Sequence, residues 1–391
     1  MMMNILMVNF PAEGHVNPTL GIAKAFAERG DNVHYITTEK FKERLEGVGA
    51  IVHLHTDLLR KASINHFTPS GLNTFINIHI QTSLDILEIT KQLSETINFD
   101  FVFYDKFGAG ELVRDYLHIP GISSSASFLM PKEEFKNILS SDLFQPDENV
   151  ERLLDQMMEK FDVLPKNMLQ FMNNSGDLNI VYTSRYFQPG NELFGEEYVF
   201  IGPSFPQRKT TVHFSLEGLK DKKVLYISMG TVLDHVEQFF NTCIDAFSDF
   251  EGKVVIAAGE KSDFTKIKQA PENFIISPYV PQLEVLNQSD VIITHGGMNS
   301  VNEAIHYSVP LVVIPHDKDQ PMVAQRLTEL GAGYRLSKDN INVHFLKDAV
   351  NEVLSNSEYK EAIQKIKDSF QACGGPEKAI RVIDSFLKNS I

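Results

Sequence analysis

Apolar residues recur along the chain in two alternating patterns. Short runs with almost no polar residue, such as Asn4–Phe10 and Phe101–Tyr104, are typical of buried strands. Other segments, such as Thr19–Arg29, carry apolar residues three and four positions apart, which places them on one face of a helix. Strands that alternate with helices predict a parallel sheet wrapped by helices. In the first half, the predicted strands are Asn4–Phe10, Asn32–Thr37, Ala50–Leu54, Phe101–Tyr104 and Ile119–Ser123, with a helix at Thr82–Thr96.

The same alternation starts again after a stretch with two prolines and poor periodicity. We therefore predict an α/β protein with two Rossmann-like βαβ domains, at residues 1–205 and 224–375, joined by a linker at 206–223. Residues 376–391 form a last helix with an apolar stripe that suits packing on either domain. The predicted strands of the second domain are Val224–Ser228, Lys253–Ala257, Phe274–Ser277, Asp290–Thr294 and Pro310–Ile314, and its helices are Val236–Phe250, Asn299–Tyr307, Gln320–Leu330 and Val343–Leu354.

Residues 128–172 interrupt the alternation and are rich in phenylalanine and methionine. One interpretation is a helical core, because such residues at helical spacing usually pack on a neighbouring element. The other is an adaptable apolar pocket that lines an acceptor site. The residues concerned are Phe128, Met130, Phe135, Phe144, Met157, Met158, Phe161, Met168, Phe171 and Met172.

Charge and cysteine content narrow the classes of function. The 36 basic and 51 acidic residues give a net charge of −15, which argues against a nucleic-acid or anionic-membrane partner. Cys243 and Cys373 lie far apart, so we expect neither a disulfide framework nor a thiolate metal site, and a reducing cytoplasm fits best. The first ten residues lack a basic region and a cleavage site, and no run of 18 apolar residues occurs, so we expect no signal peptide and no membrane insertion.

Sheet topology predicts which loops meet in the first domain. In an open parallel sheet that winds outward from its centre, strands one and four are neighbours and a ligand crevice opens at their carboxyl ends. The loop after strand one contains His15, and strand four is followed by Asp105. A histidine oriented by a carboxylate is a general base for a hydroxyl. The alternatives are a structural histidine and an aspartate that caps the next helix.

In the second domain the corresponding loops carry glycines and hydroxyls. They are Ser228–Thr231 and the His295–Gly297 turn, which is followed by Asn299 and Ser300 at a helix start. Glycines let the backbone approach a ligand, and free N–H groups at a helix N-terminus attract an anion. A plain strand-to-helix turn is the alternative interpretation. Two such crevices, one in each domain, would hold two substrates.

Two other patterns partly match a dinucleotide-binding motif and a divalent-metal site. Gly108-Ala109-Gly110 lacks the third glycine of a dinucleotide fingerprint, so we reject that interpretation. Asp317 and Asp319 have a spacing compatible with a divalent metal, but no third ligand is nearby. We therefore expect no metal here, and favour a role in binding sugar hydroxyls or a place on the surface.

Several of these motifs together resemble a known family. The segment Tyr279–Gln320 is similar to the donor-binding signature of family 1 glycosyltransferases. These are UDP-sugar-dependent enzymes of the GT-B fold, in which two domains face each other across a cleft. The loops around His15 and Thr231 match the same family, so the resemblance covers nearly the whole chain. It is strongest toward the macrolide and flavonoid glucosyltransferases found in bacilli. The matching positions are Pro11, Gly14 to Pro18, Ser228 to Thr231, Pro281, Gln282, Thr294 to Ser300, Glu303, Val309, Pro310, Pro315, Asp319 and Gln320.

The resemblance implies a reaction and a role for each matched residue. His15 would deprotonate the acceptor hydroxyl and Asp105 would orient His15, with inversion at the anomeric carbon and without a metal or cofactor. The partners would be a UDP-sugar, most simply UDP-glucose, and a small apolar acceptor with a hydroxyl. In the donor, Tyr279 and Val280 would contact uracil, Gln282 and Glu303 would bind the ribose, and Asp319 and Gln320 would bind the sugar. The full set of donor-binding residues implied is Gly14, Ser228, Gly230, Thr231, Tyr279, Val280, Gln282, His295, Gly296, Gly297, Met298, Asn299, Ser300, Glu303, Asp319 and Gln320.

Three departures and two alternatives accompany this prediction. Tyr279 and Met298 stand where plant members have tryptophan, and Asp317 stands where an aromatic residue is common. These differences affect nucleotide choice and the polarity of the sugar pocket. The alternatives are a sugar-nucleotide epimerase of the same fold and a non-catalytic protein that sequesters a ligand.

Overall fold

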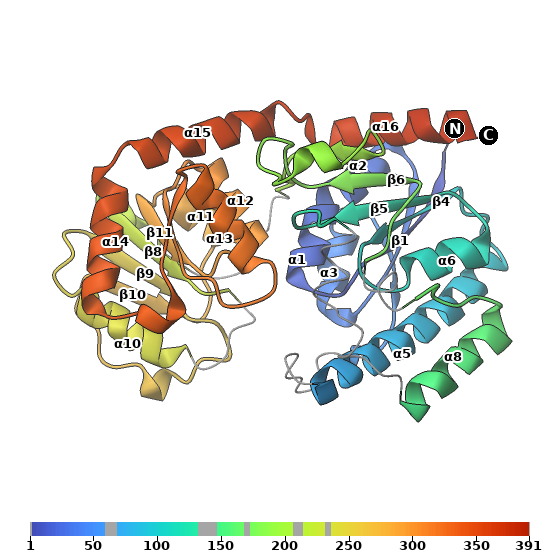
Figure 1. Cartoon of the computed structure of the whole chain (residues 1–391), viewed down its shortest axis with the longest axis horizontal. Coiled ribbons are helices and arrows are strands. Elements are labelled where there is room, and N and C mark those ends of the chain that lie inside the picture. Colours follow the sequence, from blue (N-terminus) through green and yellow to red (C-terminus); the bar gives the residue numbers. More distant parts are fainter. Residues whose placement is uncertain are drawn as a thin grey trace. The chain divides into compact units, whose positions relative to one another are not determined.

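The computed structural model of this chain describes residues 2–58, 69–131, 147–167, 173–205, 214–230 and 236–390. The chain forms two compact units, Met1–Pro206 with Cys373–Ile391, and Gln207–Ala372. Each unit is built on one parallel sheet with helices around it (Figure 1). Some sequence predictions lie outside the described residues: Thr231, the 206–213 part of the linker, and Phe135, Phe144, Met168, Phe171 and Met172.

The first unit has a seven-stranded sheet in the order β3-β2-β1-β4-β5-β6-β7, and every pair is parallel. As the topology rule requires, β1 lies beside β4, with Val8 opposite Tyr104. The strands are β1 (Asn4–Val8), β2 (Asn32–Thr37), β3 (Ile51–Leu54), β4 (Phe101–Asp105), β5 (Gly121–Ser125), β6 (Leu178–Val181) and β7 (Tyr198–Phe200).

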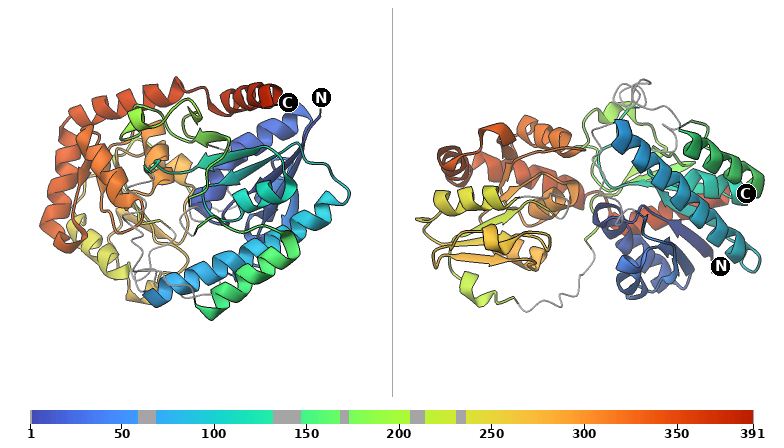
Figure 2. Two further views of the ribbon diagram at one scale, coloured as in Figure 1. Left: turned by 45° about the vertical axis from the view of Figure 1, so that its right-hand side comes forward. Right: turned by 90° about the horizontal axis from the view of Figure 1, so that it is seen from below.

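Both faces of this sheet are buried, because successive side chains of a strand point to opposite sides. Ile5 and Met7 of β1 pack with α2 (Leu20–Arg29) and α16 (Gly375–Ser390). Leu6 and Val8 pack on the other face with α5 (Pro69–Ser94), α6 (Gly110–Leu117) and α8 (Glu148–Phe161). The helices α5 and α8 run side by side in both views of Figure 2. Because side chains on both faces are buried in these two clusters, the strand sequences are nearly continuous apolar runs.

The last helix, α16, belongs to the first unit. Ala379 and Ile383 are fully buried in the same cluster as Phe26 of α2. At the edge of this contact, Arg29 Nη1 donates to both carboxylate oxygens of Asp384 at 2.8 Å. The apolar stripe predicted for this segment is therefore the face that packs on α2.

Some predictions about the first unit are wrong in detail. The loop expected after strand one contains the short helices α1 (Glu13–Val16) and η1 (Asn17–Thr19). Two further short helices, η2 (Glu39–Phe41) and α3 (Lys42–Glu46), follow β2. Strand β5 begins at Gly121 rather than Ile119, since Pro120 has no N–H to donate to a neighbouring strand. Strands β6 and β7 were not predicted, because runs of four and three residues give too little periodicity. Helix α5 starts before Thr82, in a segment rich in Ser, Gly and Asn that disfavours a helix prediction.

The second unit has a six-stranded parallel sheet in the order β10-β9-β8-β11-β12-β13. Its central pair, β8 and β11, again corresponds to strands one and four. The predicted strands are present, and a short one, β13, was missed. The elements are η4 (Glu217–Leu219), β8 (Val224–Ser228), α10 (Glu237–Ala246), β9 (Lys253–Ala257), η5 (Phe264–Lys266), β10 (Phe274–Ser277), α11 (Gln282–Leu286), β11 (Val291–Thr294), α12 (Met298–His306), β12 (Leu311–Val313), α13 (Gln320–Glu329), β13 (Gly333–Arg335), η6 (Lys338–Asn340), α14 (Val343–Ser355) and α15 (Glu358–Gln371).

The predicted fold class is confirmed, since both units are Rossmann-like α/β domains with parallel sheets. Within the described part of the Phe- and Met-rich region, Met157 and Phe161 of α8 are buried against α5, which supports a helical core there. Met158 is exposed.

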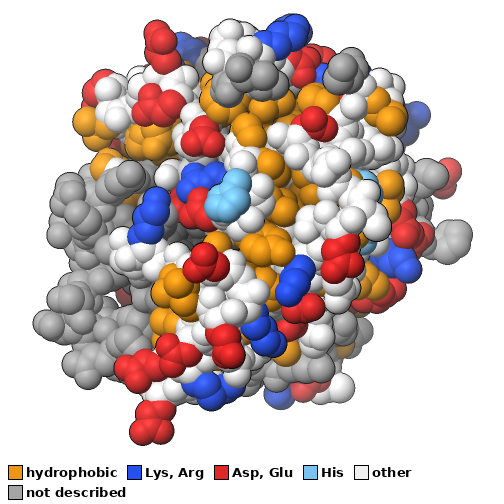
Figure 3. Space-filling view, turned by 90° about the vertical axis from the view of Figure 1, so that its right-hand side faces the viewer, with side chains coloured by type: hydrophobic (Ala, Val, Ile, Leu, Met, Phe, Trp, Pro, Cys, Tyr) orange, Lys and Arg blue, Asp and Glu red, His pale blue; other side chains and the backbone are white. Residues whose placement is uncertain are grey.

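Charged side chains of both signs lie on the surface (Figure 3), and both cysteines are thiols. On the face shown in Figure 3, acidic and basic side chains are interspersed, and neither sign forms a continuous patch. Neither Cys243 nor Cys373 forms a disulfide. Among the residues that the structure describes, no helix has the length and hydropathy needed to cross a membrane.

Candidate active site

In the first unit, the carboxyl ends of β1 and β4 bring His15 and Asp105 together. Asp105 is the last residue of β4, and His15 lies on α1, which follows β1. His15 Nδ1 and Asp105 Oδ2 are 2.6 Å apart, and their side chains are 27% and 3% exposed. The carboxylate is thus buried while the imidazole remains accessible. Such an arrangement suits a base that must reach a substrate.

Backbone contacts fix the orientation of the Asp105 carboxylate. Its other oxygen, Oδ1, accepts a hydrogen bond from the Phe107 N–H at 2.9 Å. The loop after β4 is held by buried Asn174, whose amide nitrogen donates to the carbonyls of Asp105 and Gly108 at 3.2 and 3.0 Å. Because both carboxylate oxygens are occupied, Asp105 has little freedom to turn away from His15.

Helix α1 is attached to its neighbours through Glu13. Glu13 Oε2 accepts from Arg44 Nη1 at 2.7 Å, and its Oε1 lies 3.1 Å from Lys40 Nζ. Asn17 donates to the same carboxylate at 3.2 Å. Burial would raise the pKa of Glu13, but hydrogen bonds and charges from Arg44 and Lys40 lower it on balance. Gly14, between Glu13 and His15, has open space where a Cβ atom would lie.

A mostly apolar pocket lies next to this pair. Its lining includes Asn9, Phe10, His79, Thr82 and Phe107. Phe10 packs edge-on against His15, with ring centroids 5.1 Å apart, and stacks on His79 at 5.3 Å. Phe107 also contacts His15, at 5.5 Å. The pocket and the His15–Asp105 pair therefore share two aromatic walls.

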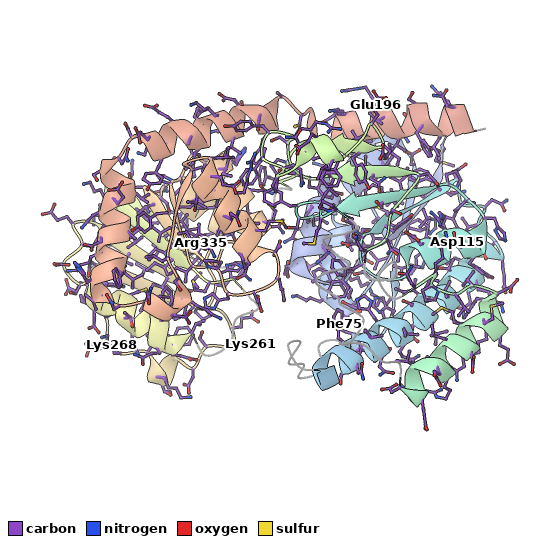
Figure 4. All side chains as sticks on the ribbon, viewed as in Figure 1. Phe75, Asp115, Glu196, Lys261, Lys268 and Arg335 are labelled. Carbon is purple, nitrogen blue, oxygen red and sulfur yellow. The ribbon has the colours of Figure 1, made fainter. Side chains whose placement is uncertain are left out.

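His79 is a neutral imidazole within this pocket. Burial lowers its pKa to about 4, and the negative charge of Asp105 only partly opposes that shift. Phe75, labelled in Figure 4 on α5, packs edge-on against the His79 ring at 4.8 Å.

In the second unit, two glycines approach the ring of His295. A Cβ atom at Gly230 would lie 2.6 Å from Cε1 of His295, and one at Gly297 would lie 2.5 Å from Nε2. Gly230 and Gly296 also have positive φ angles of 77° and 86°, which disfavour other residues. The loops after β8 and β11 thus meet around one imidazole, immediately before the N-terminus of α12.

His295 is also uncharged near neutral pH. Burial lowers its pKa to about 4, although Asp319 and a hydrogen bond to the backbone of Ser228 act in the opposite direction. A neutral imidazole has a single N–H donor and contributes no positive charge.

Gln282, Ser300 and Glu303 form a second cluster in this unit. Gln282 Nε2 donates to Glu303 Oε2 and, at 3.4 Å, to Ser300 Oγ. Gln282 Oε1 accepts from the Tyr226 hydroxyl at 2.9 Å. The structure therefore brings together the two residues that the family resemblance assigns to the ribose, and links them to each other.

The side chain of Gln320 organises the loop before α13. Its Oε1 accepts from the backbone N–H groups of His316 and Asp317 at 2.9 and 3.3 Å, and its Nε2 donates to Asp317 Oδ1 at 3.1 Å. Lys318, within this loop, has a left-handed φ of 57°. Gln320 is thus engaged in shaping the loop that carries Asp319.

The other predicted donor residues differ in exposure. Tyr279 is 47% exposed, whereas Val280 and Met298 are buried. Ser228 is buried, and Asn299 lies partly exposed in the first turn of α12. Thr231 lies outside the described residues. Across the described ranges, no group of three or more His, Cys, Asp or Glu side chains has the arrangement of a metal site.

Sequence reasoning did not single out Asn9, His79, Asn174 or Tyr226. Their roles depend on contacts between segments far apart in the chain. One signal was available for Asn9, since it lies between a buried apolar run and the segment that carries His15.

Comparison with known proteins identifies the family. Residues 241–384 match the family model of the erythromycin biosynthesis protein CIII-like C-terminal domain. The chain is 64% identical over 391 residues to the uncharacterised UDP-glucosyltransferase YdhE of Bacillus subtilis (strain 168), covering 99% of each chain. It is 33% identical over 396 residues to the NDP-glycosyltransferase YjiC of the same organism, covering 99% of this chain and 98% of that protein.

The solved structures agree with the sequence comparison. The crystal structure of CalG4, the calicheamicin glycosyltransferase, superposes with a TM-score of 0.83 at 26% identity, covering 100% of this chain and 99% of that one. With this fold and these relatives, the chain belongs to family 1 of the glycosyltransferases and is a UDP-glycosyltransferase of the GT-B fold.

Proposed function

We propose that this enzyme is an inverting glycosyltransferase that moves a hexose, glucose in the simplest case, from a UDP-sugar to a hydroxyl of an apolar acceptor such as a flavonoid or macrolide. His15 is the general base and Asp105 orients it. The observation that carries the proposal is the 2.6 Å contact between His15 Nδ1 and the buried Asp105 carboxylate.

The tautomer follows from this contact. If Nδ1–H donates to the Asp105 carboxylate, Nε2 carries the lone pair and can take the proton of an acceptor hydroxyl. The resulting imidazolium is stabilised by the adjacent carboxylate. The acceptor oxygen forms a bond to the anomeric carbon as the bond to UDP breaks, so the product has the opposite anomeric configuration.

The second unit holds the donor in this proposal. His295, Asn299, Ser300 and the N–H groups at the start of α12 bind the diphosphate, together with Thr231. Hydrogen-bond donors aimed at the leaving oxygen stabilise its developing charge without a metal. The close approach of Gly230 and Gly297 to His295 supports this assignment, since a side chain at either glycine would displace the ring.

The remaining donor contacts are assigned by residue type. Tyr279 and Val280 contact uracil, and Asp319 and Gln320 bind sugar hydroxyls. Gln282 and Glu303 bind the ribose, for which their mutual hydrogen bond gives a fixed starting geometry.

The acceptor binds to the first unit in this proposal. Support comes from the pocket beside His15, whose walls are largely aromatic and aliphatic. Membership in a transferase family supports this reaction over both alternatives, the epimerase and the sequestering protein.

The test is a transfer assay with UDP-glucose, other UDP-sugars, and a panel of flavonoids and macrolides, with products identified by mass and anomeric configuration by NMR. We expect His15→Ala to lower kcat by about 10²–10⁴ while UDP binding is unchanged. The matched control is His344→Ala, since His344 is an exposed histidine that pairs with Asp348 on α14. A His15→Ala enzyme with normal turnover would disprove the base assignment.

Two further readouts test the finer claims. A product that retains the donor's anomeric configuration would contradict inversion. Activity that is lost in EDTA and restored by Mn²⁺ would contradict metal independence and return attention to Asp317 and Asp319.

A further inference from the structure

Asn9 is a buried amide at the end of β1 with no hydrogen-bond partner for its side chain. It follows Val8 directly, and its side chain is 3% exposed. Within the part of the chain that the structure describes, neither Nδ2 nor Oδ1 of Asn9 has a partner. A buried amide with both ends unpaired destabilises a folded protein, so native proteins rarely retain one without a functional reason.

The surroundings of Asn9 show what kind of group it can bind. It lines the pocket together with the apolar residues Phe10, Ile78 and Phe107. The hydroxyl of Ser83, on the same pocket wall, already donates to the carbonyl of His79 at 2.8 Å. In Asn9, by contrast, Nδ2–H can donate and Oδ1 can accept at the same time. A hydroxyl is one group that can do both, so an apolar molecule that carries a hydroxyl would complement this amide.

The position of the pocket relates this amide to the reacting centre. Phe10 contacts the His15 ring edge-on and stacks on the His79 ring. A molecule that enters this pocket and contacts Phe10 is therefore separated from the His15 ring by one aromatic side chain.

We propose that Asn9 determines acceptor specificity by binding a second hydroxyl of the acceptor, different from the hydroxyl that His15 deprotonates. The inference rests on the proposed function, in that the first unit must bind the acceptor. The preferred substrates are then apolar molecules with at least two hydroxyls, such as polyphenols.

The experiment compares two flavonoids that share the glycosylated hydroxyl, one of which lacks a single distal hydroxyl. We expect the wild-type enzyme to favour the dihydroxy acceptor by about tenfold in kcat/KM, mainly through KM, which is the effect of one well-placed hydrogen bond. In Asn9→Leu, which keeps the same number and branching of side-chain heavy atoms but has no hydrogen-bonding group, this ratio should fall to near one. Asn9→Ser keeps a smaller group that can donate and accept, so it should show an intermediate ratio. This variant still tests the proposal if Asn9→Leu does not fold.

Thr37→Val is the matched control. It removes a buried hydroxyl of the same unit for which the described residues provide no partner, and Thr37 does not line the pocket. It should leave the ratio of the two acceptors as in the wild type. We also expect Asn9→Leu to raise the melting temperature, because it removes an unpaired buried amide, whereas a lower melting temperature would mean that the fold itself satisfies Asn9.

The outcomes separate this inference from the proposed function. A wild-type ratio in both Asn9 variants would overturn the role of Asn9 while leaving the transferase proposal intact. If the wild-type protein transferred no sugar to any acceptor, the proposed function would fail. Dissociation constants of the two flavonoids measured without donor would then still decide whether Asn9 discriminates between them.

Discussion

Burial controls the charge of two histidines that lie close to the proposed substrates. His79 and His295 both have a pKa lowered to about 4, in each case mainly because the ring is removed from water. Both are therefore neutral where the enzyme is expected to work. A neutral His79 keeps the proposed acceptor pocket free of charge, and a neutral His295 brings no positive charge to the proposed donor site.

The shifted pKa of His79 predicts that the first unit loses stability in acid. Between pH 6.5 and 4 the unfolded chain binds a proton at this position and the folded chain does not. The contribution of His79 to the free energy of unfolding is thus fully present above pH 6.5 and is lost as the pH falls toward 4. The loss is on the order of 3 kcal/mol. We expect His79→Phe to show a shallower decline in unfolding free energy over this range. Parallel pH profiles from denaturant titrations of the two proteins would contradict this.

At the scale of single elements, a short helix carries the proposed base. Helix α1 has four residues, too few for a helix to be stable without contacts to its surroundings. Those contacts are the bonds from Glu13 to Arg44, Lys40 and Asn17. The position of His15 therefore depends on a carboxylate two residues away that takes no part in the chemistry.

We expect Glu13→Gln to lower kcat by roughly two- to fivefold while the affinity for UDP stays unchanged, because partly exposed ion pairs contribute up to about 1 kcal/mol. The measurement is steady-state kinetics together with calorimetric titration of UDP. Glu28→Gln is the control, since Glu28 forms an exposed pair with Lys24 on α2. Equal kcat values in both variants would show that α1 holds its position without Glu13.

The elements differ in how well their sequence predicts them, for physical reasons. Strand β4 is fully buried and reads as Phe-Val-Phe-Tyr, which leaves little ambiguity. Strand β13, Gly-Tyr-Arg, is a three-residue edge strand whose pairing to β12 comes from its position in the fold rather than from its own residues. Local pattern is informative where burial is complete and uninformative at the edges of the sheets.

The same distinction applies to the site. The meeting of His15 with Asp105 follows from the strand order, which sequence alternation alone can predict. Asn174 supports the Asp105 loop from 69 positions away, and no local pattern predicts that contact. Contacts of this kind depend on the packed structure.

At the scale of the whole molecule, the first unit is completed by the last helix of the chain. Ile383 of α16 is fully buried against the α2 side of the sheet. We expect Ile383→Ala to destabilise the first unit by about 2–5 kcal/mol through the loss of buried volume. Calorimetry should show a lower unfolding temperature for this unit, while the second unit should still bind UDP. Lys388→Ala, at an exposed position of the same helix, should have little effect, and similar melting curves for the two variants would argue against this role of α16.

The placement of α16 has a consequence for biosynthesis. A ribosome makes the strands of the first unit early, then all of Gln207–Ala372, and only then the segment Cys373–Ile391 that finishes the first core. At about 5–20 residues per second, the face of the sheet around Phe26 waits on the order of ten seconds or more for its covering helix. The second unit can fold during that interval, so the unit made first is completed last, and its exposed apolar face is where we expect a chaperone to bind the nascent chain.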